Sequence, residues 1–115
     1  MSFLSRLMNR PSDAASLAPA DFVADRDPSA PVLDVRTPAE FASGHLASAV
    51  NVDVQAPDFR EQVGALGLGA GPVYLYCRSG NRSGQAAGVL REMGHAGAVN
   101  VGGLDALVAA GAEPA

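Results

Sequence analysis

The chain has 115 residues, enough for one domain with little left over for a second. Twelve acidic residues against eight basic ones give a formal net charge of −4, so there is no electrostatic reason to expect nucleic acid or an anionic membrane as a partner. The single cysteine excludes an internal disulfide, and with only two histidines it cannot complete a tetrahedral zinc site, so no metal is expected.

Residues 1–13 are predicted to be an N-terminal extension that precedes a domain formed by residues 14–115. The opening sequence MSFLSRLMNR has no signal-peptide core, and no apolar run in the chain approaches the ~18 residues of a membrane span. A cytoplasmic protein with no stable membrane association is therefore expected. The extension is interpreted as a frayed segment packed on the domain, with an anchor for a membrane or a partner as the alternative.

The first part of the domain is predicted to contain two strands, each followed by a helix. A short strand at Leu17 leads into a helix with Pro19 near its start, where the missing N–H costs nothing. Residues 31–36, PVLDVR, form an extended apolar run typical of a buried parallel strand. Thr37 can then cap a short helix, with Glu40 in the position that a capping box requires.

The rest of the chain alternates in the same way. The predicted strands cover residues 49–52, 73–76 and 98–101, and the predicted helices cover residues 57–66, 83–93 and 104–110. This alternation of short strands and helices predicts a three-layer α/β domain. Its mainly parallel central sheet is expected to have about five short strands flanked by helices.

The most informative segment lies between the last two of these units. Cys77 is at the carboxyl end of a predicted strand, on the rim where ligands bind in open α/β sheets. The loop after it combines small or conformationally tolerant residues with two cations: Arg78, Ser79, Gly80, Asn81 and Arg82. The small residues let successive backbone N–H groups turn inward around the sulfur. The arginines and the start of the next helix add positive charge.

These features favour the thiolate form of Cys77 over the thiol. Such surroundings lower the pKa of a cysteine from about 8.5 to about 3.5–7.5, and the thiolate is the nucleophilic form. A ring of N–H donors can also hold an anion or the terminal sulfur of a persulfide. The alternative is an inert cysteine packed as a small apolar residue. Inert cysteines seldom lie in a Gly/Ser/Asn loop between two arginines, so we favour the reactive interpretation.

Three segments resemble one family. The loop C-R-S-G-N-R, followed by Ser83, matches a common bacterial form of the active-site loop of single-domain rhodaneses, which are thiosulfate and related sulfurtransferases. Upstream, LDVRTPAEFASGHLASAVNV resembles the family pattern L-D-V-R-x-x-x-E-F-x-x-G-H-[IL]-x-G-A-x-N-[IV]. Downstream, VNVGGLDAL resembles the closing V-x-x-[LV]-x-G-G-[ML]-x-A-W. The resemblance extends from about residue 17 to residue 110 and implies a rhodanese-like fold.

The resemblance implies a ping-pong transfer of sulfane sulfur through a persulfide on Cys77. A small anionic sulfur donor such as thiosulfate would bind to Arg78 and Arg82, while the amides of the loop stabilise the persulfide. The outer sulfur would pass to a thiophilic acceptor, which is cyanide, a thiol or a sulfur-acceptor protein. No cofactor is required.

Residues outside the loop are expected to have supporting roles. Asp34 and Arg36 belong to the family's D-x-R signature. We expect Asp34 to bond nearby loop amides and Arg36 to pair with a carboxylate such as Glu40. The histidine at position 45 is mostly structural in the family. Asn100 is expected to satisfy backbone groups at the end of its strand.

Two other functions are weighed against sulfur transfer by an enzyme. Cysteine phosphatases and arsenate reductases are the nearest rivals, since related phosphatases share this fold. Their loops have the form C-x5-R, whereas here the arginine falls one residue earlier, at Arg82, and the shorter loop fits a smaller sulfur-centred anion. Non-catalytic binding modules of this fold usually lack the cysteine. A sulfur-relay protein that passes its persulfide to a dedicated partner stays open.

Overall fold

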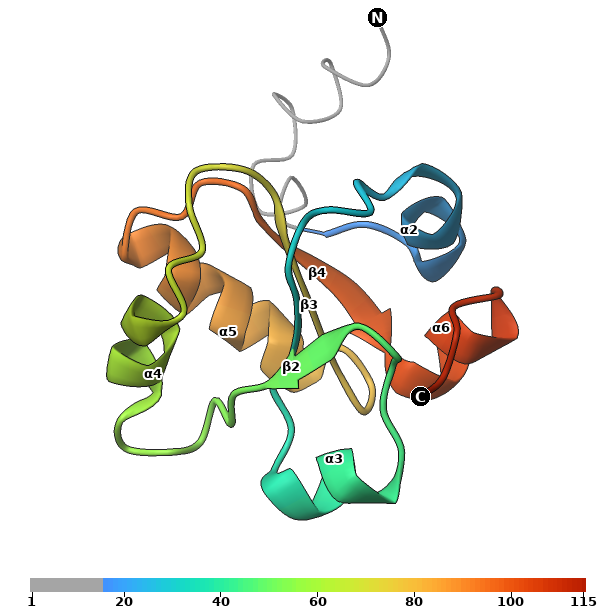
Figure 1. The fold of residues 1–115 in the computed structure, drawn as a ribbon, viewed down its shortest axis with the longest axis horizontal. Helices are drawn as coiled ribbons and strands as arrows, with labels where there is room; N and C mark the ends of the chain where they lie inside the picture. The colour runs from blue at the N-terminus through green and yellow to red at the C-terminus, as the bar shows by residue number, and fades with distance from the viewer. Residues whose placement is uncertain (1–15) are drawn as a thin grey trace, which may run out of the picture.

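Helices and short strands alternate along residues 16–115, the part of the chain that the computed structural model describes (Figure 1). The strands are β1 (Val32–Asp34), β2 (Ala49–Asn51), β3 (Val73–Cys77) and β4 (Ala98–Gly103). The helices are α2 (Pro19–Asp25), α3 (Pro38–Ser43), α4 (Phe59–Ala65), α5 (Asn81–Glu92) and α6 (Leu104–Ala109). The extension predicted for residues 1–13 lies outside the described residues. Within the described part, no helix is long and apolar enough to cross a membrane.

The strands form one four-stranded sheet in the order β2-β1-β3-β4, and every neighbouring pair is parallel. The prediction of about five strands is therefore too high by one, and the strand expected at Leu17 is the one that does not form. That segment makes only an isolated bridge between Ser16 and Asn100, beside which the N–H of Leu17 donates to the carbonyl of Asn100 at 2.8 Å. Pro19 has no N–H to extend the pairing, and it begins α2 instead.

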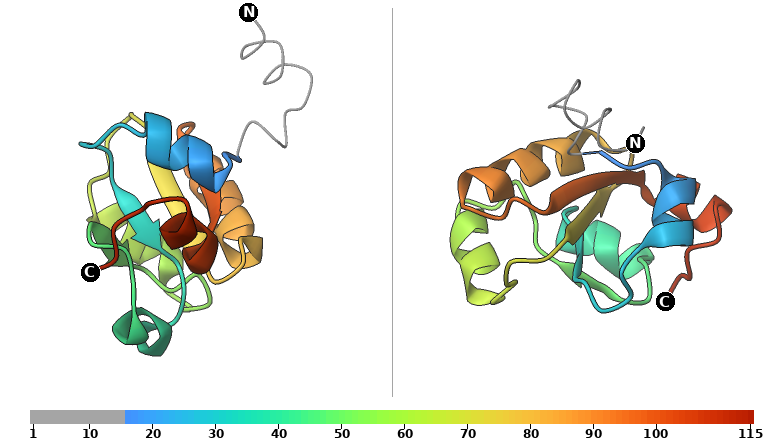
Figure 2. Two further views of the ribbon diagram at one scale, coloured as in Figure 1. Left: turned by 90° about the vertical axis from the view of Figure 1, so that its right-hand side faces the viewer. Right: turned by 90° about the horizontal axis from the view of Figure 1, so that it is seen from above.

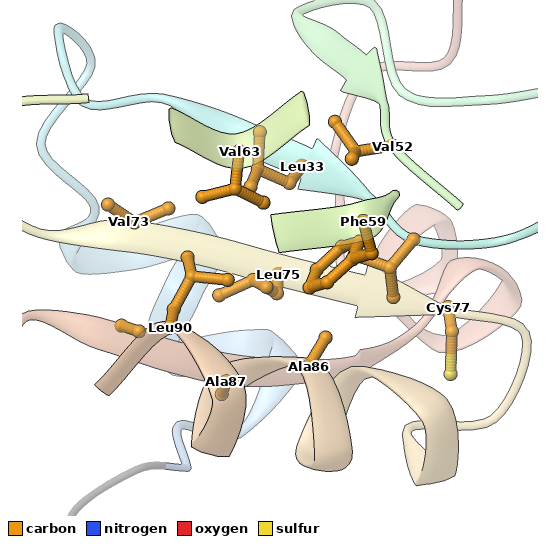
Figure 3. Packing of buried hydrophobic residues seen from close by; sticks show 12 residues of the cluster. Leu33, Val52, Phe59, Val63, Val73, Leu75, Cys77, Ala86, Ala87 and Leu90 are labelled. Carbon is orange, nitrogen blue, oxygen red and sulfur yellow. The ribbon is translucent and has the colours of Figure 1, made fainter. Parts of the chain in front are cut away.

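Helices cover both faces of this sheet, as the views in Figure 2 show. Helices α4 and α5 pack on one face, and α2 and α6 pack on the other. Successive side chains of β3 alternate between the two cores. Leu75 and Cys77 belong to the core under α4 and α5, which Figure 3 shows from close by. Tyr74 and Tyr76 belong to the core under α2 and α6. The predicted three-layer α/β arrangement is thus confirmed.

The carboxyl ends of the parallel strands meet at one edge of the sheet. In the observed register Cys77 is paired with Gly103 of β4, and β1 ends at Asp34 on the other side of β3. This edge carries the cysteine loop, as the sequence predicted. Helix α5 begins at Asn81, two residues earlier than expected, so the segment between β3 and α5 is only three residues long.

Candidate active site

Cys77 is the last residue of β3 and is almost fully buried, with 1% of its surface exposed. In Figure 3 its sulfur lies beside the loop and the first turn of α5. The backbone N–H of Gly80 donates to Cys77 Sγ at 3.0 Å, and the hydroxyl oxygen of Ser83 lies 3.4 Å from the same atom. The chain bends back on the sulfur at Gly80, whose φ of 99° is in the left-handed region that favours glycine.

Burial and hydrogen bonds act on the pKa of Cys77 in opposite directions. Burial raises the pKa of the Cys77 thiol, because it removes water from around the thiolate. Opposing this, the hydroxyl and N–H of Ser83 and the N–H groups of Ser79 and Gly80 donate to the thiolate, and their combined effect is larger. The pKa of Cys77 therefore lies below its ordinary value, as the sequence predicted. The hydrogen bonds are the largest causes of this lowering, while the charge of Arg82 also interacts with that of Cys77.

Arg82, in the first turn of α5, is held by Glu40 of α3. Its Nη1 and Nη2 donate to the two carboxylate oxygens of Glu40 at 2.8 and 2.9 Å. The same carboxylate closes the capping box of α3, where Glu40 Oε1 accepts the N–H of Thr37 at 3.1 Å. The guanidinium of Arg82 and then the N–H of Thr37 lower the pKa of Glu40 from 4.5 to about 2. Arg82 thus links the cysteine loop to α3.

Arg36 pairs with a carboxylate, as expected, but the choice of Glu40 as its partner is wrong. Arg36 pairs instead with Asp34, with 2.6 Å between Nη2 and Oδ2, and both side chains are buried. The two residues are two positions apart at the end of β1, which lets the arginine fold back onto the aspartate, while Glu40 is engaged by Arg82. Asp34 Oδ1 also accepts the backbone N–H of Arg36 at 3.0 Å, as expected of it. Arg36 Nη2 further donates to the carbonyl of Gly44, which holds the end of α3.

The other loop residues face solvent. Arg78, Ser79 and Asn81 are exposed. Within residues 16–115 no carboxylate pairs with Arg78. The two loop arginines therefore differ in surroundings: Arg78 is open at the surface, and Arg82 is half-buried and engaged.

Two residues outside the predicted set complete the surroundings of the sulfur. Asn100 of β4 donates from Nδ2 to the carbonyl of Gly80 at 2.9 Å, and its Oδ1 accepts the N–H of Gly102 at 3.0 Å. Ser83 Oγ lies 2.7 Å from Asn100 Oδ1. The expectation that Asn100 satisfies backbone groups is confirmed, but sequence reasoning missed that one of them belongs to the cysteine loop. The sequence feature that could have identified Ser83 as a neighbour of the sulfur is its position directly after the loop.

Strand β4 also forms the floor under the loop. A Cβ atom at Gly103 would overlap the carbonyl oxygen of Arg78 and lie 3.0 Å from Ser79 Cα. The φ of Gly103 is −106°, which any residue can adopt. Glycine is therefore required here for space and not for backbone conformation, because the loop backbone lies directly against this position.

Neither His45 nor any cluster of metal-ligating side chains among the described residues forms a second site. His45 stacks on Phe41 with 3.6 Å between ring centroids, and its Nδ1 lies 2.7 Å from the carbonyl oxygen of Phe41. These contacts fit the structural role expected of it. In residues 16–115, no group of three or more His, Cys, Asp and Glu side chains could hold a metal ion. The described site therefore centres on the thiol of Cys77, whose sulfur accepts hydrogen bonds from the loop and from Ser83.

Comparison with known proteins agrees with this geometry. The family model of the rhodanese-like domain matches residues 19–110. The chain is 34% identical over 73 residues to thiosulfate sulfurtransferase PspE of Escherichia coli (strain K12), a match that covers 63% of this chain and 68% of PspE. It is 38% identical over 84 residues to thiosulfate sulfurtransferase 16, chloroplastic, of Arabidopsis thaliana, covering 64% of this chain and 70% of that protein.

A solved structure supports the same assignment. The rhodanese-related protein of Thermoplasma volcanium superposes with a TM-score of 0.72 at 27% identity, covering 87% of this chain and 96% of that one. The chain therefore belongs to the rhodanese-like domain family, whose curated relatives named here are sulfurtransferases.

Proposed function

We propose that this protein is a sulfurtransferase that moves sulfane sulfur through a persulfide on Cys77. The observation that carries the proposal is the environment of Cys77 Sγ. This atom is buried at the carboxyl end of β3, and it accepts the N–H of Gly80 at 3.0 Å. A cysteine that served only to pack the core would have no such donors, and burial would leave its pKa raised. Here the pKa of the thiol is lowered, which suits a nucleophile.

In the first half-reaction the Cys77 thiolate attacks the sulfane sulfur of a small anionic donor such as thiosulfate. The S–S bond of the donor breaks, its electron pair leaves with sulfite, and Cys77 becomes a persulfide with the negative charge on the outer sulfur. Arg78 is the exposed cation at this loop and would bind the anionic end of the donor. The N–H groups of Ser79 and Gly80 would stabilise the persulfide.

In the second half-reaction a thiophilic acceptor attacks the outer sulfur. The S–S bond of the persulfide breaks, its electron pair returns to Cys77 Sγ, and the thiolate is restored. With cyanide the product is thiocyanate, and with a thiol or a sulfur-acceptor protein it is a new persulfide. Each step transfers one sulfur atom between nucleophiles, so no cofactor is needed to balance it.

Intact-mass spectrometry after incubation with thiosulfate tests this function directly. The wild-type protein should gain one sulfur atom, lose it on addition of cyanide and produce thiocyanate. Cys77→Ser should show none of these changes, because it has no thiol to load. Thiocyanate formation by Cys77→Ser at a rate near wild type would contradict the proposal. Efficient hydrolysis of an aryl phosphate, with no gain of sulfur, would instead indicate a phosphatase.

A further inference from the structure

The hydroxyl of Ser83 lies between two acceptors. Its Oγ is 2.7 Å from Asn100 Oδ1 and 3.4 Å from Cys77 Sγ, and the serine is fully buried. A hydroxyl has one proton to donate, so it can serve only one of these acceptors at a time. The choice depends on their charge, because an ionised acceptor forms the stronger hydrogen bond.

Asn100 is fixed so that its oxygen faces Ser83. Its Nδ2 donates to the carbonyl of Gly80 at 2.9 Å, and its Oδ1 accepts the N–H of Gly102 at 3.0 Å. A flipped amide would place two donors together at Gly102 and two oxygens together at Gly80. When the proton of Ser83 turns toward the sulfur, the N–H of Gly102 still satisfies Asn100 Oδ1. Either position of the proton therefore leaves no buried polar atom unpaired.

We propose that Ser83 is a catalytic residue whose proton follows the charge of Cys77, and that Asn100 is its positioning residue. The proton is donated to Cys77 Sγ when the sulfur is a thiolate and to Asn100 Oδ1 when it is not. The inference rests on the proposed function, since sulfur transfer is the reaction that moves this charge. In the persulfide the charge lies on the outer sulfur, and Sγ, bonded to carbon and sulfur, is only a weak acceptor.

This hydroxyl stabilises the thiolate relative to the persulfide, so it acts on the two half-reactions in opposite senses. In discharge, the acceptor bonds to the outer sulfur and the electron pair of the S–S bond moves to Sγ. A hydrogen bond from the Ser83 hydroxyl makes Sγ a better leaving group, since a thiol of lower pKa leaves faster. In loading, the same stabilisation makes an ionised Cys77 less nucleophilic.

The charged groups around the sulfur stay in place when Ser83 is replaced. The charge of Arg82 in α5 interacts with that of Cys77. Glu40 of α3 pairs with Arg82, and the charge of Asp53, after β2, also interacts with Arg82. Arg78 is exposed at the loop surface. No hydrogen bond joins the Ser83 hydroxyl to any of these groups among the described residues. A change in Cys77 after Ser83→Ala therefore reports the loss of the hydroxyl itself.

The first test is the pH dependence of Cys77 alkylation by iodoacetamide. In Ser83→Ala the apparent pKa of Cys77 should rise by about one unit, which slows alkylation about tenfold well below that pKa. Ser83→Thr keeps a hydroxyl and should restore the wild-type profile. The control is Ser29→Ala, which removes an exposed hydroxyl from the turn before β1 and should not shift the profile. An unchanged pKa in a folded Ser83→Ala protein would overturn the proposal.

The second test separates the half-reactions in single turnovers, at a pH where Cys77 is ionised in both proteins. Ser83→Ala should load from thiosulfate up to about threefold faster and discharge to cyanide about threefold slower. A merely disturbed site would slow both steps, and slowing of both would overturn the proposal. If wild type accepts no sulfur at all, the proposed function fails, while the alkylation test still decides whether Ser83 donates to Cys77.

The positioning role of Asn100 is tested by combining Asn100→Ala with Ser83→Ala. The pKa change caused by Ser83→Ala should be smaller in the Asn100→Ala background, because the hydroxyl is no longer held beside the sulfur. A change of equal size in both backgrounds would remove Asn100 from the proposal. Asn51→Ala is the matched control, since Asn51 donates to two backbone carbonyls but not to Ser83, and it should leave the effect of Ser83→Ala intact.

Discussion

Glu40→Gln isolates the ion pair that links the cysteine loop to α3. Glutamine has nearly the shape of glutamate and can complete a capping box with Thr37, so the helix cap is retained. What the variant loses is the negative charge of the carboxylate, whose two oxygens accept charge-assisted hydrogen bonds from Arg82 at 2.8 and 2.9 Å in the wild type. The expected result is a protein that folds normally but is less stable, with a looser start of α5.

The size of the effect follows from the pKa of Glu40. A pKa lowered from 4.5 to about 2 corresponds to about 3 kcal/mol of stabilisation if it is taken in full. The side chains of Arg82 and Glu40 are 22% and 28% exposed, and solvent screening reduces this to about 1–2 kcal/mol. In a domain of this size that loss lowers Tm by about 5–10 °C near neutral pH.

The pH dependence gives the sign of the effect. The pKa of Glu40 is lower in the folded protein, so the ionised carboxylate stabilises the fold fully above about pH 4.5. This contribution is lost as the pH falls toward 2 and the carboxylate takes up a proton. Thermal unfolding followed by circular dichroism should therefore show a gap between wild type and Glu40→Gln at pH 6 that closes as the pH approaches 2.

A matched control is the exposed pair of Arg60 and Glu92, which are also 2.8 Å apart but have side chains 57% and 68% exposed. Glu92→Gln should change the free energy of unfolding by less than about 0.5 kcal/mol at any pH. Equal Tm values for wild type and Glu40→Gln at pH 6 would refute the reasoning. So would a gap that persists unchanged at pH 2.5, because it could not come from the charge.

Two further predictions concern the walls of the loop. Arg78→Ala should raise KM for thiosulfate about tenfold with little change in kcat, whereas Arg82→Ala should lower kcat as well. Arg91→Ala is the control for an exposed arginine in α5. Equal effects on KM and kcat in both loop variants would contradict this division. Gly103→Ala should lower the free energy of unfolding by about 1–3 kcal/mol and slow alkylation of Cys77, because the new Cβ meets the Arg78 carbonyl. The control is Gly64→Ala in α4, whose Cβ meets nothing and which should be neutral or stabilising. A Gly103→Ala protein as stable as wild type would show that the loop has room to move.

Local features were predictable from the sequence because their partners are close in the chain. Thr37 and Glu40 are three residues apart, and their capping box forms as expected. Cys77 follows an apolar strand, and its place at the carboxyl edge of a parallel sheet follows from the alternation of strands and helices. The lowered pKa of Cys77 was also predictable in direction, since the small residues after it allow N–H groups to face the sulfur.

Pairings between distant segments could not be predicted, because several partners of the same chemical type were available. Glu40 was expected to meet Arg36, but it meets Arg82, 42 positions further along the chain. Both guanidinium groups suit the carboxylate, and only the tertiary fold, which brings Glu40 within reach of Arg82, decides between them. The role of Asn100 depends in the same way on β4 lying next to β3.

The lowered pKa of Cys77 depends on these tertiary contacts as much as on the loop sequence. Burial by itself raises the pKa of the thiol, so a buried cysteine without its donors would be less acidic than one in water. The N–H of Gly80 reaches the sulfur only while the loop follows its observed path, and Asn100 fixes that path from β4 while Glu40 fixes it from α3. A substitution far from Cys77 in the chain can therefore raise the pKa of the thiol while the C-R-S-G-N-R sequence stays intact.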